Sequence, residues 1–300
     1  MKKGKYLDLH THTLQSDGNL TAEQLIELAI ANDIGVLSIT DHNLVMPLEE
    51  FQRLQEKYKD KITLIQGSEV SMIYKTSKDE LKEIHVVVLF KDPDKLRFLN
   101  GRTMDRVGYV NAIKKALFNV GIEIPDYEHL KECYPETKHL GRKHVADWMY
   151  KHGLVDSVDD AFDIYIGGFG EGRAFVDSAP YRSGYGMMED TIAEIRQAGG
   201  DSVIGIILAH PLYYKLDEEE LLRLIRMFKD AAGEIAGMEV LYARYDDEQR
   251  AFLKALADGA AGEGYTFKYS AASDYHGQAD SDSLDNQFPV EVAEWLNDYL

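Results

Sequence analysis

The 300-residue sequence lacks several features that define whole classes of protein. Its single cysteine, Cys133, excludes an intrachain disulfide and fits a reducing cytoplasm. It has no run of about 18 apolar residues, so we expect no transmembrane helix. The basic start at residues 1–5 is followed by an alternating strand pattern and not by an apolar core, so we expect no signal peptide. These absences predict a cytoplasmic protein.

Positive charge is also scarce, with 33 Lys and Arg against 52 Asp and Glu and a net charge of −19. Nucleic-acid binders obtain their phosphate affinity mainly from Lys and Arg, so we expect no stable binding of duplex nucleic acid. A small phosphorylated substrate is still compatible with this charge, because bound divalent cations can reverse the local field of an acidic protein.

Strand and helix signals alternate in the first 92 residues and again after residue 188. Strands are predicted near 6–12, 36–40, 62–65, 84–90, 203–209, 238–242 and 265–270. Helices are predicted near 21–33, 48–58, 218–232 and 246–257. This alternation is typical of an α/β fold with a parallel sheet.

Residues 93–188 interrupt the alternation, because the strand signal fades and the segment is rich in Tyr, Gly, Lys and His. Helical patterns cover Val107–Val120, Gly141–His152 and Val158–Tyr165. We therefore predict a discontinuous α/β domain, residues 1–92 and 189–300, into which a helical cap subdomain of residues 93–188 is inserted.

Two short motifs near the ends of the chain, His10-Thr11-His12 and Asp274-Tyr275-His276, carry paired potential metal ligands. Side chains of a β-strand alternate between its faces with a period of two, so each motif points its pair to one face. Two strand ends that each present paired ligands are typical of a metal site.

Further candidate ligands lie at or just beyond predicted strand ends, the edge at which β/α barrels assemble their active sites. His85 is the exception, because it lies near the start of its strand. The remaining four histidines, His129, His139, His144 and His152, all lie in the middle segment. The full candidate set is His10, His12, Asp17, His42, Glu69, His85, His210, Asp274 and His276.

Imidazole and carboxylate ligands without thiolate suit Zn, Mn or Fe. Nine ligands are too many for one ion and suit two or three divalent ions bridged by a shared carboxylate. In such a cluster a bound water becomes a hydroxide nucleophile near neutral pH, and flanking ions stabilise the oxygens of a displacement at phosphorus. The set predicts hydrolysis of a phosphoester.

Each motif by itself also has a simpler explanation. A lone His-x-His is more often surface or packed histidine, and an isolated Glu69 or Asp17 would usually be solvated. His85 and His210 lie in apolar strands, where a hydrogen-bonded core histidine is the default. Asp41, beside His42, could cap a helix. Only the joint occurrence of these residues favours the metal site.

Seven motifs carry a resemblance to a known family: Asp8-Leu9-His10-Thr11-His12, Ser16-Asp17-Gly18, Thr40-Asp41-His42, Gly67-Ser68-Glu69, Ile84-His85, Ala209-His210-Pro211 and Ser273-Asp274-Tyr275-His276-Gly277. On these motifs the sequence resembles the PHP (polymerase and histidinol phosphatase) superfamily over nearly the whole chain outside the insert. Within it, the sequence is most similar to the TrpH/RNase AM-like phosphoesterases. Asp17, and the segment Gly141-Arg142-Lys143-His144, support that grouping.

The resemblance implies a distorted (β/α)7 barrel and a trinuclear site. It implies one ion held by His10, His12, Glu69 and Asp274, a second by Glu69, His85 and His210, and a third by Asp17, His42 and His276. Relatives in this group hydrolyse nucleoside 3′,5′-bisphosphates or trim short RNA from its 5′ end. Lys143 replaces the usual proline and Ala272 the usual glycine, and these departures leave the ligands intact.

Residues outside the ligand set are candidates for substrate binding and proton transfer. Arg142 can bind phosphate bidentately, and His144 can bind phosphate or protonate a leaving oxygen. We assign acid–base roles to His144 and Asp17, and substrate binding to Arg142, His144 and Arg244. For Lys143 we prefer an ordinary surface charge. Residues 181–186 are either a lid or an exposed loop.

These observations predict a metal-dependent hydrolase that needs two or three Mn, Zn or Fe ions. Its expected substrate is a small AMP- or pAp-like nucleotide or a short RNA. The alternatives are a histidinol-phosphate-like small-molecule phosphatase and a non-catalytic, metal-stabilised module. An amidohydrolase is less favoured, because no lysine occupies a strand end as a coordinating residue.

Overall fold

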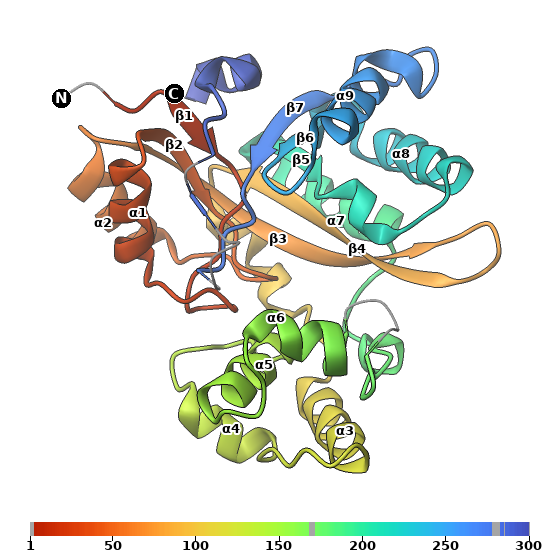
Figure 1. Cartoon of the computed structure of the whole chain (residues 1–300). Helices are drawn as coiled ribbons and strands as arrows, with labels where there is room; N and C mark the ends of the chain where they lie inside the picture. Colours follow the sequence, from red (N-terminus) through yellow and green to blue (C-terminus); the bar gives the residue numbers. More distant parts are fainter. Residues whose placement is uncertain (1–2, 168–171, 278–282, 285, 300) are drawn as a thin grey trace.

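The computed structural model describes residues 3–167, 172–277, 283–284 and 286–299. Its strands form one seven-stranded sheet in the order of the sequence (Figure 1). The strands are β1 (Tyr6–Asp8), β2 (Ile34–Ile39), β3 (Thr63–Lys75), β4 (Leu81–Phe90), β5 (Val203–Leu208), β6 (Ala236–Tyr242) and β7 (Lys268–Ala272). The predicted α/β class is confirmed, although the predicted last strand, 265–270, began three residues too early.

The sheet is mostly parallel, but β4 runs antiparallel to both of its neighbours, β3 and β5. The expected parallel pairing is therefore found for β1–β3 and β5–β7, but not for β4. Only residues 76–80 separate β3 from β4, and a connection this short can join only antiparallel strands. The reversal puts the start of β4 at the edge where the neighbouring strands end, which explains the unusual position of His85.

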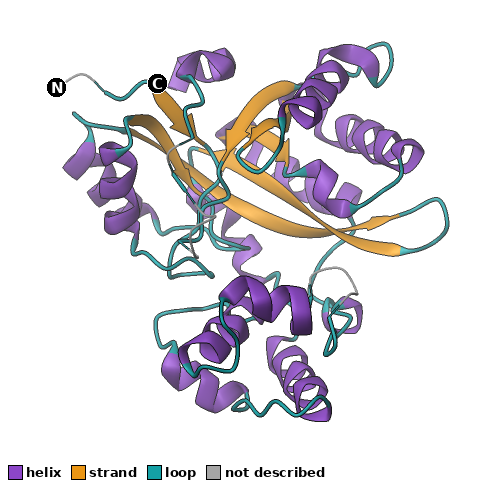
Figure 2. Ribbon diagram, in the orientation of Figure 1, coloured by secondary structure: helices purple, strands orange, loops and turns teal. Residues whose placement is uncertain are grey.

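The two outer strands of the sheet meet through the end of β7 and the residues that follow β1 and β7. The Leu9 amide donates to the Ala271 carbonyl at 3.0 Å, and the Asp274 amide donates to the His10 carbonyl at 2.9 Å. Thr11 and Tyr275 form a parallel bridge. The sheet thus curls into a distorted barrel (Figure 2).

One apolar cluster receives side chains from every strand, among them Leu7, Val36, Ile65, Val87 and Ile207. Among the described residues, no α-helix contributes a side chain to this cluster, so it fills the inside of the barrel. The C-terminal segment η8 (Val290–Tyr299) packs Trp295 and Leu296 against it and closes one end. The polar residues described below occupy the opposite end.

Helices cover the outside of the barrel through two further apolar clusters. Near β2, α1 (Ala22–Ala31) and α2 (Leu48–Tyr58) pack against the sheet. Near β5 and β6, the covering helices are α7 (Met188–Gly199), α8 (Glu218–Ala232) and α9 (Asp247–Ala255). Thr21 caps α1 with the predicted N-terminal geometry, since its side chain accepts from the Gln24 amide.

The middle segment is helical and has an apolar cluster of its own, which runs from Tyr109 to Ala174. Leu96 and Leu99 instead pack into the barrel's outer cluster. The domain division at residues 92/93 and 188/189 stays a prediction. The segment contains η1 (Pro93–Gly101), α3 (Arg106–Asn119), α4 (Tyr127–Cys133), α5 (Arg142–Lys151), α6 (Val158–Asp160), η2 (Ala161–Ile166) and η3 (Ala179–Tyr181).

Within the described ranges, every helix is too short or too polar to cross a membrane.

Candidate metal centre

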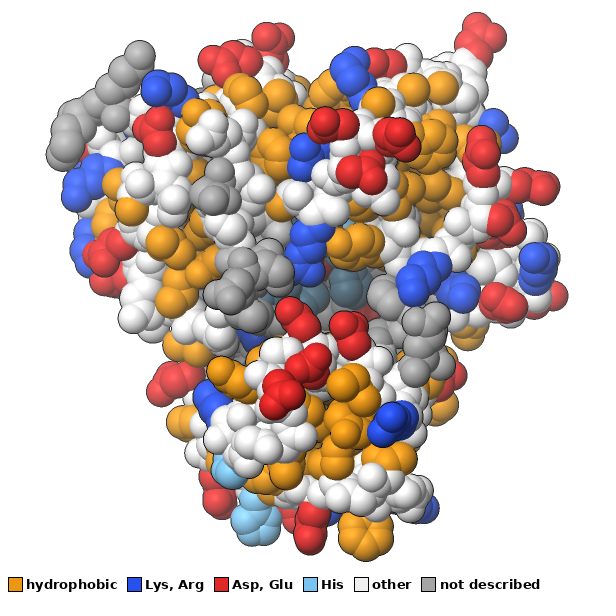
Figure 3. Space-filling model, viewed as in Figure 1, with side chains coloured by type: hydrophobic (Ala, Val, Ile, Leu, Met, Phe, Trp, Pro, Cys, Tyr) orange, Lys and Arg blue, Asp and Glu red, His pale blue; other side chains and the backbone are white. Residues whose placement is uncertain are grey.

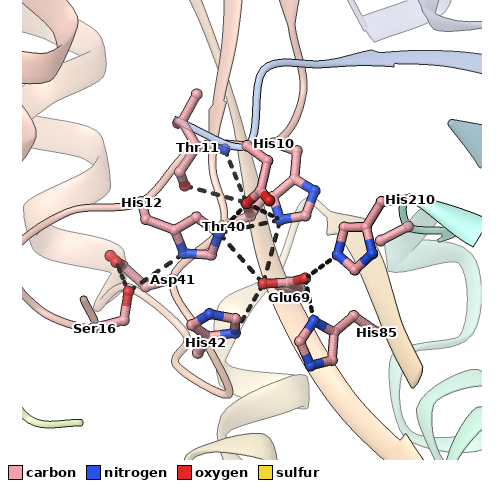
Figure 4. A network of polar contacts seen from close by, with 12 residues as sticks. His10, Thr11, His12, Ser16, Thr40, Asp41, His42, Glu69, His85 and His210 are labelled. Atoms are coloured by element: carbon pink, nitrogen blue, oxygen red, sulfur yellow. Dashed lines mark hydrogen bonds and ion pairs between the residues drawn. The ribbon is translucent and has the colours of Figure 1, made fainter. Parts of the chain in front are cut away.

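Glu69 lies at the centre of a cluster of imidazoles at the open end of the barrel (Figure 4). Its side chain comes from the middle of β3 and is fully buried. Imidazole nitrogens approach both carboxylate oxygens: His85 Nδ1 at 2.8 Å and His210 Nε2 at 3.2 Å from Oε1, and His42 Nδ1 at 2.8 Å, His10 Nε2 at 3.3 Å and His12 Nε2 at 3.3 Å from Oε2.

Two aspartates extend the cluster on either side of His12. Asp274 Oδ1 lies 3.2 Å from His12 Nε2 and 3.5 Å from His10 Nε2. Asp17 places Oδ1 at 3.3 Å from His276 Nε2 and Oδ2 at 3.6 Å from His42 Nε2. The fold therefore brings all nine candidate ligands together, although they come from both ends of the chain.

Ligand atoms converge tightly in three groups among the described residues: His10, His12, Glu69 and Asp274; His12, Asp17, His42 and His276; and His42, Glu69 and His85. The first group equals the first implied ligand set. The second contains the implied third set together with His12. The third contains His42 where the resemblance implied His210, which lies beside the same Glu69 oxygen as His85.

The donor chemistry fits divalent cations. Glu69 Oε2 and Asp17 Oδ1 are buried and accept no well-directed hydrogen bond from the described residues, although His42 Nδ1 lies 2.8 Å from the first oxygen and His276 Nε2 lies 3.3 Å from the second. Burial by itself raises the pKa of the Glu69 carboxyl, but the surrounding histidines His42 and His10 hold it well below its usual range. Buried, ionised carboxylate oxygens surrounded by imidazole nitrogens are the ligands that zinc and manganese take in proteins.

The surrounding carboxylates shift the histidines in the opposite direction. Burial alone lowers the pKa of His85, but Glu69 reverses this and raises it to about 9. The pKa of His10 is raised well above its usual value, because Glu69 and Glu239 outweigh its burial. A metal ion entering the site must therefore displace protons.

Asp41 organises the loop that carries Asp17. Its Oδ1 accepts from the Thr13 amide at 2.8 Å and the Ser16 hydroxyl at 2.5 Å, and its Oδ2 accepts from the Thr13 hydroxyl at 2.6 Å. The carboxylate thus holds a neighbouring loop, and the helix-cap alternative does not describe it (Figure 4).

Two carboxylates that touch the ligand histidines were missed in the sequence. Glu239, on β6, lies 2.7 Å from His10 Nδ1, and Glu83, on β4, lies 3.2 Å from His85 Nε2. Glu83 also pairs with Arg182 Nε at 2.9 Å, which ties the 181–186 segment to the barrel. For Glu239 the available signal was a single acidic residue within an apolar strand, because a buried carboxylate needs partners. Glu83 precedes the predicted strand 84–90 and gave no such signal.

A pocket of about 210 Å³ lies between this cluster and the helical segment. Figure 3 shows histidine side chains deep in the hollow between the two parts. Asp17, His42 and His85 line its barrel wall. Arg106, His139, Arg142, Lys143 and His144 line its helical wall.

Of the predicted substrate-binding residues, Arg142 and His144 line the pocket and Arg244 does not. Arg142 Nη1 donates to the Gly167 carbonyl at 3.2 Å. His144 Nδ1 accepts from the Gly141 amide at 3.1 Å, and burial lowers the pKa of its imidazole to about 4. Arg244 is exposed and lies beside Tyr213.

The expectation that Lys143 is a surface charge is wrong. Its residue is only 8 % exposed, and its ammonium donates to the Asp17 carbonyl and, at 3.4 Å, to the His276 carbonyl. Neighbouring contacts join the same loop: the Thr137 hydroxyl donates to the Ser16 carbonyl, and the Lys138 amide donates to the Gln15 carbonyl at 3.1 Å. The helical segment thus holds the loop that carries Asp17.

Comparison with known proteins gives consistent matches. Residues 8–176 match the family model of the PHP domain. A 5′-3′ exoribonuclease Rnm of Escherichia coli (strain K12) is 30% identical over 253 residues, which cover 83% of this chain and 80% of the relative. A 3′,5′-nucleoside bisphosphate phosphatase of Chromobacterium violaceum is 27% identical over 281 residues, 90% and 87% of the two chains.

Two solved structures share the fold at a TM-score of 0.73. One is described as a metal-dependent phosphoesterase of Bifidobacterium adolescentis; it is 22% identical, and the match covers 98% of this chain and 96% of that one. The other is described as an amidohydrolase of Chromobacterium violaceum with bound sulfate; it is 24% identical, and the match covers 96% of each chain.

Proposed function

Because the chain belongs to the PHP domain family, we propose that it is a metal-dependent phosphoesterase acting on a nucleoside 3′,5′-bisphosphate or the 5′ end of a short RNA. One observation carries the proposal: nine candidate imidazole and carboxylate ligands, with Glu69 at their centre, lie directly beside a pocket with arginines on its far wall. When bound, divalent ions supply Lewis acidity towards phosphoryl oxygens and a water nucleophile of lowered pKa.

The helical wall of the pocket supplies positive charge for a substrate phosphate. Arg106 donates to His139 Nδ1 at 2.9 Å, and Arg142 donates to the Gly167 carbonyl. In the described part of the chain neither arginine forms an ion pair with a carboxylate. An arginine that is held by neutral acceptors keeps its full charge for an anion, and its guanidinium matches phosphate in shape.

The His144 imidazole is expected to be uncharged before substrate binds. Since burial lowers its pKa to about 4, the imidazole is unprotonated near pH 7 and can accept or donate one hydrogen bond. A dianionic phosphate beside it raises that pKa and allows it to deliver a proton to the leaving oxygen. Asp17, held in its loop by Lys143 and Thr137, belongs with the ligands on the opposite wall.

Arg244 suits longer substrates. It lies outside the pocket beside Tyr213, whose ring is 5.8 Å from that of His210. A mononucleotide bound between the cluster and Arg142 leaves Arg244 unused, whereas an RNA chain leaving the site can reach it.

A substrate panel on manganese-loaded protein tests the proposal. The panel contains a nucleoside 3′,5′-bisphosphate, a nucleoside 5′-monophosphate, short RNA with a 5′ phosphate or a 5′ hydroxyl, and histidinol phosphate. We expect turnover of the bisphosphate or the 5′-phosphorylated RNA, loss of turnover after chelation, and recovery after manganese or zinc is added back.

Three results would contradict this proposal. Preference for histidinol phosphate would favour the small-molecule phosphatase. Absence of turnover with metal bound would favour a non-catalytic module. Full activity after exhaustive metal removal would exclude the metal-dependent reaction.

A further inference from the structure

Glu239 is a carboxylate buried inside the barrel, at the boundary between the apolar interior and the polar end. It lies on β6 and is 0% exposed, and the strand residues on either side of it, Met238 and Val240, pack into the outer apolar cluster. A carboxylate in such surroundings is costly unless both of its oxygens have partners. The identity of these partners therefore indicates its role.

Each oxygen of Glu239 contacts a different candidate ligand residue. Oε1 lies 2.7 Å from His10 Nδ1, and Oε2 accepts from the main-chain amide of His210 at 2.7 Å. These residues follow β1 and β5, and the contacts span 229 and 29 residues of sequence. One side chain thus connects two strand ends that contribute to the cluster around Glu69.

The contact with His10 decides which of its nitrogens is available to a metal. A carboxylate only accepts hydrogen bonds, so it keeps a proton on Nδ1 and makes Nε2 the nitrogen that gives up its proton and offers a lone pair when a metal binds. That nitrogen faces Glu69 Oε2 at 3.3 Å and Asp274 Oδ1 at 3.5 Å, where the first ligand group converges.

The contact with His210 supports an unusual backbone conformation. His210 has φ +29° and ψ 55°, which non-glycine residues rarely adopt and which costs on the order of 1–3 kcal/mol. Its amide hydrogen bond to Glu239 helps to hold this turn, from which the imidazole reaches Glu69 Oε1 at 3.2 Å.

We infer that Glu239 is a positioning residue that sets the His10 tautomer and the His210 turn for metal binding, an inference that rests on the proposed function. Outer partners of this kind orient ligating histidines, and their loss typically lowers metal affinity roughly 10- to 100-fold.

The variant Glu239→Gln separates this role from a purely structural one. The His210 amide can only donate, so the new amide oxygen must turn towards it, and the new NH₂ group then faces His10 Nδ1. His10 can accept that hydrogen bond only by moving its proton to Nε2, the atom that faces the other ligands. Both hydrogen bonds survive in this variant, but the tautomer is reversed.

We expect Glu239→Gln to fold with a melting temperature near that of the wild type without metal, and to bind Mn²⁺ or Zn²⁺ roughly 10- to 100-fold more weakly in calorimetric titration. The matched control is Glu220→Gln. Glu220 is a buried carboxylate that accepts from the Tyr74 hydroxyl and the Ser77 amide on the β3–β4 hairpin, outside the ligand groups. This control should bind metal as the wild type does.

A second measurement keeps the inference testable if the variant does not fold. In zinc-loaded wild-type protein with ¹⁵N-labelled histidine, His10 should show a protonated Nδ1 and a zinc-bound Nε2. A protonated Nε2 would overturn the inference, as would wild-type metal affinity in a folded Glu239→Gln variant. If the wild type itself bound no divalent ion, the proposed function would fall together with the inference, so the two failures can be told apart.

Discussion

Histidines line both walls of the pocket, and the two walls shift their pKa in opposite directions. On the barrel wall, Glu69 overcomes the effect of burial and raises the pKa of His85 to about 9. On the helical wall, burial lowers the pKa of His139 to about 3 and that of His144 to about 4. Burial is common to both walls, so the difference lies in the neighbouring carboxylates.

The direction of the pKa shift separates candidate metal ligands from candidate substrate contacts, whereas the presence of histidines, which is common to both walls, does not. A histidine beside a shared carboxylate can exchange its proton for a metal ion. A buried histidine beside an arginine, such as His139 beside Arg106, stays neutral and adds no charge to the site. The barrel wall therefore suits cations and the helical wall suits the anionic substrate.

Glu69→Gln should have the largest effect on the barrel wall, because it removes the carboxylate that contacts five histidines. We expect metal affinity and kcat/KM to fall by more than the roughly 10- to 100-fold typical of outer-shell partners. Metal content and steady-state kinetics on the manganese-loaded protein measure this. Glu220→Gln serves as the control, and near-normal metal content in Glu69→Gln would refute the assigned centre.

Arg142→Ala tests the anionic side of the comparison. A hydrogen bond between charged groups is worth about 1.5–3 kcal/mol, so KM for the bisphosphate should rise roughly 10- to 150-fold with metal affinity unchanged. Arg244→Ala should weaken binding of RNA while leaving the bisphosphate unaffected. The exposed Arg97 offers a control that should change neither. Reduced metal binding in Arg142→Ala would show that the two walls do not act separately.

Acid should lower the free energy of unfolding, because the buried His144 on the helical wall resists protonation in the folded protein. Its pKa in the folded protein, about 4, lies below the ordinary value of 6.5, so the unfolded chain binds more protons between these pH values. Stability present above pH 6.5 is lost as pH falls towards 4, by up to about 3 kcal/mol. Denaturant titrations of wild type and His144→Gln at pH 7 and pH 4.5 measure this. Equal acid sensitivity in both proteins would contradict the expectation.

Alkali should act on the barrel wall in the metal-free protein. The folded pKa of His85, about 9, lies above 6.5, so its stabilising contribution is complete below pH 6.5 and is lost as pH rises through about 9. Histidine NMR of the metal-free protein should therefore show His85 titrating far above His144. Overlapping titrations would remove the distinction between the walls.

Lys143→Ala should have the smallest of these effects, on the loop that joins the two walls. Loss of the ammonium leaves the carbonyls of Asp17 and His276 without this donor. We therefore expect the affinity for the metal ion that binds last to fall several-fold, with little change in the affinity for the others. Lys138→Ala is the control, since Lys138 is exposed and contacts the loop through its main chain. A tighter last ion in Lys143→Ala would mean that the ammonium repels the metal.

Much of the candidate site followed from local pattern. Strand ends with His-x-His and Asp-x-His spacing, and a glutamate just beyond a predicted strand, predicted which side chains meet, because the ends of parallel strands share one edge. Helices with clear caps and apolar stripes, such as α8, were placed residue for residue. The reversed β4 was missed, since a buried strand has the same apolar pattern in either direction.

The sequence by itself determined the donor set of this protein: an acidic chain with a single cysteine and nine candidate imidazole and carboxylate ligands, most of them at or just beyond the ends of predicted strands. Tertiary structure alone decided which partners these ligands acquire. Glu239 contacts His10, which is 229 residues away in the sequence. Lys143 is buried, and its ammonium donates to the Asp17 carbonyl. The hydrophobic periodicity and the secondary-structure propensity of a segment fix the face on which a side chain lies. The residue that this side chain contacts depends on the register and packing of elements distant in sequence.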